Sequence, residues 1–83
     1  MKLKMVMRPP TDEDVEVGKS YIVRIEGSHV GEVNDWLLYR TRDYKGNGQW
    51  WVDYFDTYLS KVSPDYEDSI IGFCPEPIEV TCE

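Results

Sequence analysis

The side chains that could hold a metal ion or act as a nucleophile are few in this sequence. They are one histidine, His29, and two cysteines, Cys74 and Cys82. Structural zinc usually takes four ligands, often from closely spaced cysteine pairs, and these two cysteines lie outside that spacing. A dyad of Cys74 and His29 would need an activating environment, which spacing alone does not supply. We therefore expect no metal site and interpret Cys74 as a small core residue.

The motifs of the common enzyme classes are also missing. The sequence has no Gly-x-Ser-x-Gly nucleophile motif, and Gly46-Asn47-Gly48 lacks the lysine and helix that follow a phosphate-binding loop. Because there are sixteen acidic residues, many carboxylate pairs can be drawn, so no single pair indicates a glycosidase. We predict a protein that is not an enzyme and needs no cofactor.

Acidic residues alternate with tyrosines in two stretches, 53–58 and 65–68. Tyrosine offers contact area at a low entropy cost, and carboxylates steer basic partners and pair with arginine. In the alternative interpretation, the acids simply face water and the rings pack in the core. The residues that we predict to bind a partner are Asp53, Tyr54, Asp56, Tyr58, Asp65, Tyr66, Glu67 and Asp68.

The charge of the chain is strongly negative and unevenly spread. Sixteen acids against nine bases give a net charge of −7, and residues 53–83 carry most of the excess of acids. Such a field repels phosphate backbones and anionic membranes, and it favours basic partners or simply solubility. Arg40, Arg42 and Lys45 offer at most a small positive spot at a hairpin end. We therefore expect no direct binding to nucleic acid.

The length and the hydropathy pattern predict a single domain, residues 1–83, without a membrane segment. The N-terminal apolar stretch is short and is interrupted by Lys4, and no apolar run approaches the roughly 20 residues that span a bilayer. We expect a cytoplasmic protein with reduced thiols. Three tryptophans, six tyrosines and two phenylalanines supply the core.

The clearest strand signal is residues 20–26, where Tyr21, Val23 and Ile25 alternate with more polar neighbours. Residues 2–7 alternate in the same way until Arg8-Pro9-Pro10 ends the pattern. An exposed acidic loop is expected at 11–16 and another loop at 27–35.

A second group of strands follows around a turn. Residues 36–42 form a predicted strand, with Leu38 and Arg40 on one face, and the glycines of 43–48 predict a tight hairpin. Residues 49–55 should pair back antiparallel, whereas 56–62 are open between strand and helix. A short strand is expected at 69–73, and the prolines after it indicate a sheet edge, with Ile78 and Val80 pairing briefly.

Together these elements predict a mostly β fold with little helix. Four to five short strands would form a small antiparallel sheet or an open SH3-like barrel.

Three short motifs resemble a known group of proteins. They are Met7-Arg8-Pro9-Pro10, the strand Tyr-Ile-Val-Arg-Ile at 21–25 and the tail Gly72-Phe73-Cys74-Pro75-Glu76-Pro77, with Trp36 and the aromatic hairpin between them. The chain resembles short phage- and prophage-encoded domains of unknown function, which carry an Arg-x-Pro element and a Trp-x-Pro-x-Pro tail. Phe73 stands where tryptophan is usual. The resemblance implies an origin in a bacteriophage or mobile element and no reaction.

These observations predict an interaction protein of phage origin. It would bind and inhibit a protein of the bacterial host that has a basic surface, such as one that handles nucleic acid or serves in defence. Two alternatives stay open. One is a small-ligand pocket for a nucleotide, formed by Trp36, Trp50, Trp51 and Tyr54, and the other is a structural phage component.

Overall fold

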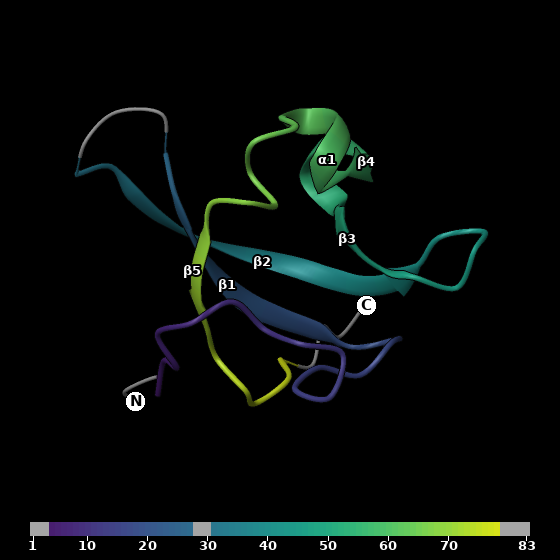
Figure 1. The fold of residues 1–83 in the computed structure, drawn as a ribbon, viewed down its shortest axis with the longest axis horizontal. Helices are drawn as coiled ribbons and strands as arrows, with labels where there is room; N and C mark the ends of the chain where they lie inside the picture. Colours follow the sequence, from purple (N-terminus) through teal and green to yellow (C-terminus); the bar gives the residue numbers. More distant parts are fainter. Residues whose placement is uncertain (1–3, 28–30, 79–83) are drawn as a thin grey trace.

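The computed structural model describes residues 4–27 and 31–78, in which five strands form one antiparallel sheet with the order β4-β3-β2-β1-β5 (Figure 1). A one-turn 3₁₀ helix, η1, and a one-turn α-helix, α1, lie beside it. The prediction of a mostly β fold with little helix is confirmed. The elements are β1 Ser20–Glu26, β2 Val33–Arg42, β3 Gly48–Val52, η1 Asp53–Phe55, β4 Thr57–Tyr58, α1 Leu59–Val62 and β5 Ile70–Phe73.

The hairpin of β1 and β2 is the centre of the sheet. Strand β1 has the predicted bounds, and its three apolar residues of one face are buried. Strand β2 begins at Val33, inside the segment predicted as a loop. Asn34 and Asp35 are poor strand formers, but the ladder continues through them because Asp35 lies opposite Arg24 and accepts its Nε–H at 2.7 Å.

The chain turns back after β2 as predicted. Asp43 Oδ1 accepts the backbone N–H groups of Lys45 and Asn47, and Gly46 takes a φ of 86° that favours glycine. Strand β3 then ends at Val52, so the predicted strand 49–55 is wrong in its second half.

Helix η1 replaces the last part of that strand and turns the chain. Asp56 adopts a left-handed φ of 51°, which a short polar side chain tolerates, and β4 then pairs back on β3. The segment 56–62, which stayed open between strand and helix, contains both, β4 and α1.

The predicted strand at 2–7 is reduced to one bridge between Val6 and Phe73, in the part of that segment that the structure describes. Strand β5 matches the expected short strand, and Ile78 then pairs with Ser20 in a bridge, as predicted. The predicted pairing of Val80 lies outside the described residues. Pro9 and Pro10 follow the first bridge, and Pro75 and Pro77 precede the second. Because proline donates no hydrogen bond, these residues limit the pairing beside each bridge.

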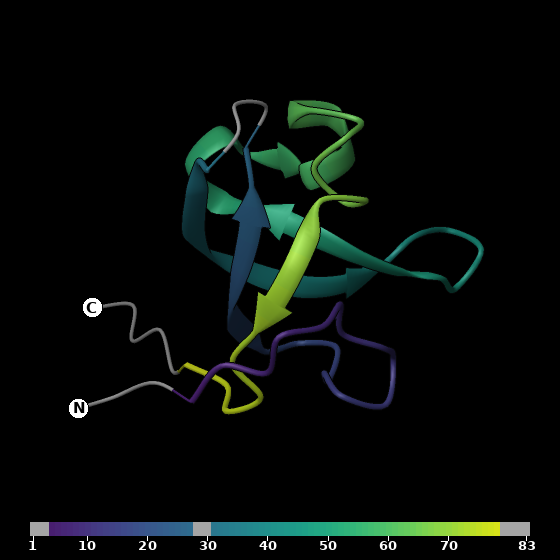
Figure 2. The same ribbon diagram turned by 60° about the vertical axis from the view of Figure 1, so that its left-hand side comes forward.

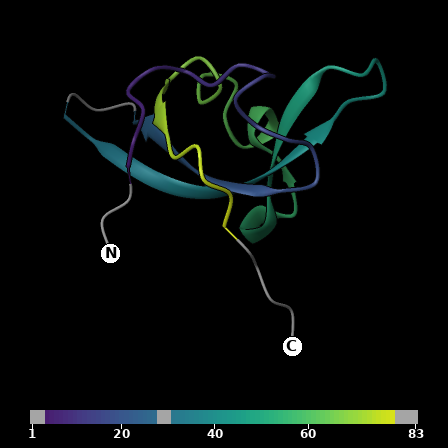
Figure 3. The same ribbon diagram turned by 90° about the horizontal axis from the view of Figure 1, so that it is seen from below.

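The core lies on one side of β1 and β2, the side covered by the N-terminal segment (Figure 3). Figure 2 shows α1 at one end of the sheet and the N-terminal segment at the other. The expectation of a fully exposed loop at 11–16 is wrong at Val15, which is only 4% exposed. Its side chain fills the core where the loop crosses the sheet. None of the helices in the described part of the chain has the length and apolar character that crossing a membrane requires.

Candidate functional site

The eight residues predicted to bind a partner do not form one continuous surface. Asp53 and Tyr58 line a hollow on the outer face of the sheet, whereas Tyr54 and Tyr66 line another beside Trp36. Glu67 lines a third, which also contains Arg40. The remaining three, Asp56, Asp65 and Asp68, are exposed.

The first hollow is an aromatic corner, by which we mean Tyr39, Trp51, Tyr58 and the carboxylate of Asp53. Tyr39 lies opposite Trp51 in the ladder of β2 and β3, and Trp51 lies opposite Tyr58 in that of β3 and β4. Directly opposed residues point to the same face of a sheet, so the register alone brings the three rings together. With Thr41 they line a hollow of about 320 Å³.

The shape of the corner is set by two close contacts. The rings of Trp51 and Tyr58 stand nearly perpendicular, at 86°, with their centres 5.0 Å apart. The indole N–H of Trp51 donates to Asp53 Oδ1 at 3.0 Å, which fixes the carboxylate beside the ring. Helix η1 makes this contact possible, because it begins at Asp53 and turns its side chain back toward β3.

The second hollow contains a row of rings that continues to the surface. Trp36 lies 5.6 Å from Tyr66 and 6.3 Å from Phe55, and Phe55 lies 5.0 Å from Tyr54, measured between ring centres. Tyr66 packs against the core, whereas Tyr54 is 89% exposed. The predicted tyrosines therefore have different roles, and Tyr54 is the exposed end of the row.

Arg40 lies inside the protein, and the predicted positive spot of Arg40, Arg42 and Lys45 is wrong in this respect. The residue is only 8% exposed, because it shares the inward face of β2 with Leu38. Its guanidinium group lies 4.8 Å from the ring centre of Trp50.

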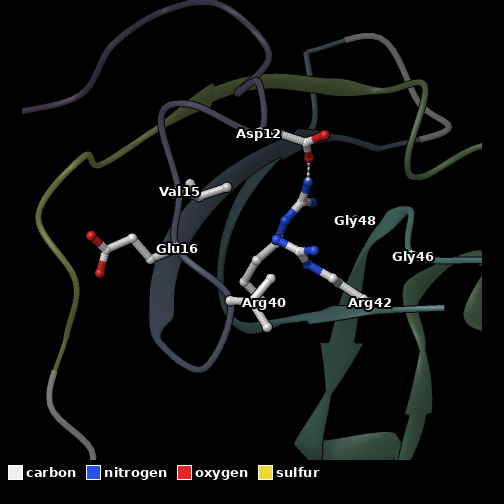
Figure 4. A pocket seen from close by; sticks show the side chains of 8 residues that line it. Asp12, Val15, Glu16, Arg40, Arg42, Gly46 and Gly48 are labelled. Atoms are coloured by element: carbon white, nitrogen blue, oxygen red, sulfur yellow. Dashed lines mark hydrogen bonds and ion pairs between the residues drawn. The ribbon is translucent and has the colours of Figure 1, made fainter.

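The other partner of Arg40 comes from the N-terminal loop. Arg40 Nη2 donates to Asp12 Oδ1 at 2.6 Å, the interaction marked in Figure 4. Both groups lie close to Gly48, where a Cβ would overlap the guanidinium group. The hollow around them, about 440 Å³, also contains Arg42 and Glu16, whose carboxylate points away from the two arginines (Figure 4).

A second ion pair holds the same loop. Asp14 accepts hydrogen bonds from Arg8 Nη1 at 2.7 Å and from the backbone N–H and hydroxyl of Thr11 at 2.7 and 2.9 Å. These bonds, the one from Arg8 above all, hold the pKa of Asp14 far below its usual range. Arg8 also lies over the ring of Phe73, with 5.4 Å between the guanidinium carbon and the ring centre.

The pKa of Glu67 is raised, whereas that of Asp14 is lowered. Partial burial raises the pKa of Glu67, and the charge of Asp68 adds to this, although Arg40 acts in the other direction. The residue as a whole is still exposed, so its carboxyl group remains accessible to a partner.

The four aromatic residues predicted to enclose a small ligand do not surround one cavity. Trp50 is buried on the inner face, edge-on to Tyr21 with 6.2 Å between ring centres. Its neighbour Trp51 points to the outer face, and Trp36 and Tyr54 line the second hollow. The sheet itself therefore separates Trp50 from Trp51.

In the described residues, no three histidine, cysteine, aspartate or glutamate side chains are grouped as a metal ion would need. His29 and Cys82 lie outside those residues, so the expectation of no metal site stays a prediction. Cys74 is buried, which confirms its interpretation as a core residue.

Two candidate sites thus stand out, the aromatic corner and, in a different hollow, the exposed Tyr54. No protein-family model, no curated protein and no solved structure matches this chain.

Proposed function

We propose that the protein is a non-enzymatic binding domain that docks on a basic protein surface through exposed aromatic and acidic side chains. The observation that carries this proposal is the exposure of aromatic and acidic side chains in η1 and beside it. There, Tyr54 and Phe55 are exposed between the exposed carboxylates of Asp53 and Asp56.

Tyr54 and Phe55 are adjacent exposed rings, and a contiguous apolar patch on the surface often marks an interaction site. Many large apolar side chains of the sheet are buried in the core, whereas Val33, Leu37 and Tyr39 are exposed, as the two rings of η1 are. Tyrosine is enriched at the energetic centres of interfaces, which agrees with a contact surface here.

The net charge of −7 supports a basic partner. Opposite charge accelerates association and makes it sensitive to salt, whereas like charge excludes acidic partners. The phage-like sequence motifs favour one form of this function, the inhibition of a protein of a bacterial host.

The test compares two exposed tyrosines. Tyr54→Ser removes the ring at η1, and Tyr44→Ser removes a ring that is 92% exposed at the tip of the distant hairpin. Each immobilised variant is incubated with bacterial lysate, washed over a salt series and analysed by mass spectrometry. Both substitutions affect solvated side chains, so both variants should fold like the wild type.

We expect a basic protein that wild type and Tyr44→Ser retain at low salt and that Tyr54→Ser loses. The retained partner should elute as salt rises, because its attraction to the carboxylates is screened. Equal retention by all three proteins, or a partner insensitive to salt, would contradict the proposed surface.

A further inference from the structure

Strand β3 carries two neighbouring indoles, and each has an aspartate beside it. Trp50 faces inward, where Asp12 lies across the guanidinium group of Arg40. Trp51 faces outward, where its N–H donates to Asp53. Because side chains alternate along a strand, the two pairs lie on opposite faces of the same sheet.

The inner pair is occupied by the protein's own arginine. The indole of Trp50 lies 4.8 Å from the guanidinium carbon of Arg40, and the carboxylate of Asp12 accepts from its Nη2 at 2.6 Å. A guanidinium group is attracted to the face of an indole and to a carboxylate at the same time, since it is both flat and charged. The molecule thus shows how an indole and a carboxylate together hold an arginine.

The outer pair offers the same groups in an open hollow. Tyr39 and Tyr58 add two rings, and the hollow of about 320 Å³ lies at the small end of the range of ligand pockets, ~300–1,000 Å³. Among residues 4–27 and 31–78, the cations that lie over rings are Arg8, Arg40 and Lys45, over Phe73, Trp50 and Tyr44, and these rings lie outside the aromatic corner.

We propose that the aromatic corner binds the side chain of an arginine presented by the basic partner. The guanidinium group stacks on Trp51 within the angle that this ring makes with Tyr58 and donates to Asp53. This inference rests on the proposed function, since it names the chemical group by which the partner is anchored.

The hydrogen-bond acceptors that Asp53 leaves open favour arginine over other cations. Its Oδ1 accepts one bond from the Trp51 indole, so Oδ2 and a further lone pair remain for donors. A trimethylammonium group has no N–H and would leave them without a partner. A lysine ammonium is compact and strongly hydrated, whereas a guanidinium group stacks and donates in parallel.

The experiment measures binding of a small probe to the whole protein. The probe is the peptide acetyl-Gly-Gly-Arg-Gly-Gly-amide, with matched peptides that carry citrulline or lysine at the centre. Citrulline has nearly the shape of arginine but no charge. Binding is followed by the NMR signal of the Trp51 indole N–H, which is identified by its loss in Trp51→Phe.

We expect the arginine peptide to shift the Trp51 signal and to saturate it, with the citrulline peptide at least about tenfold weaker. Asp53→Asn should weaken arginine binding by about fivefold or more, because it removes the charge. The asparagine oxygen still accepts the indole N–H, so the ring keeps its place. Asp56→Asn, an equal loss of charge nearby, should bind within about twofold of wild type.

Three results would overturn the inference: equal affinity for arginine and citrulline, no effect of Asp53→Asn, or no shift of Trp51 at any peptide concentration. If Tyr54 still governs retention of a basic partner in any of these cases, the proposed function stands and only the arginine anchor is wrong. If arginine binds at Trp51 but no partner depends on Tyr54, the corner stands and the proposed docking surface fails.

Discussion

Trp50 and Trp51 are neighbours in β3, yet the fold places their rings in different surroundings. Trp50 is enclosed between Tyr21 and the guanidinium group of Arg40, under the N-terminal loop. Trp51 lies on the opposite face in a hollow open to solvent. The same combination of indole and aspartate is therefore covered by the chain on one face of the sheet and open to solvent on the other.

The largest expected effect is a difference in the free energy of unfolding between a variant of the inner face and a variant of the outer face of β3. Arg40→Ala removes a buried side chain from Trp50 and from Asp12, and it should lower the free energy of unfolding by about 2–3 kcal/mol. Trp51→Val removes cross-strand contacts with Tyr39 and Tyr58 but keeps a strand-forming residue, so it should cost about 1 kcal/mol or less.

Urea unfolding of both variants, followed by tryptophan fluorescence and far-UV circular dichroism, measures the difference. The comparison is wrong if Trp51→Val destabilises the protein as much as Arg40→Ala. In that case Trp51 would be a core residue, and its exposure would have no functional meaning.

The second prediction tests how tightly the inner site is filled. A Cβ at Gly48 would overlap the guanidinium group of Arg40 and lie 2.7 Å from Asp12 Oδ1. Gly48→Ala should therefore displace Arg40 and cost about 1–2 kcal/mol in wild type.

In an Arg40→Ala background the same substitution should cost much less, because the side chain that it displaces is gone. The double-mutant cycle, measured by urea unfolding, gives the coupling directly. Additive effects of the two substitutions would show that the cost of Gly48→Ala does not come from the displacement of Arg40.

Much of the fold could be predicted because its signals are local. The alternation in Tyr21, Val23 and Ile25 identifies β1, and the glycines and asparagine of 43–48 identify the hairpin. The start of β2 could not be read in the same way. Asn34 and Asp35 disfavour strands, and only their pairing with β1 across the hairpin extends the ladder.

The sites were less predictable because they depend on contacts between distant segments. The alternation placed Arg40 on the face of Leu38, which is a signal of burial, but its partner Asp12 is 28 positions away. The aromatic corner requires the turn at η1 that brings Tyr58 opposite Trp51. Spacing alone grouped Tyr58 with Tyr54, whereas the fold places them in different hollows.

The smallest expected effect is a loss of stability at low pH, which should arise when Asp14 in the loop over the inner face of the sheet becomes protonated. Because hydrogen bonds from Arg8 and Thr11 lower the pKa of Asp14, the unfolded chain binds its proton at a higher pH than the folded protein does. This contribution to stability is complete above the ordinary aspartate pKa, near ~3.9, and is lost as pH falls below it. The lowered pKa values of Glu16, Asp35 and Asp43 act in the same direction.

Thermal unfolding between pH 5 and pH 2 should thus show a steeper loss of stability in wild type than in Asp14→Asn, which has no carboxyl group to titrate there. Arg8→Met keeps the carboxyl group but removes the main cause of its lowered pKa, so it should flatten the profile as well. If both variants instead follow the wild-type slope, the N-terminal loop does not depend on this ion pair. The cover over Trp50 would then rest on the other contacts of the loop, such as Asp12 with Arg40 and the backbone N–H of Glu16 with the hydroxyl of Tyr21.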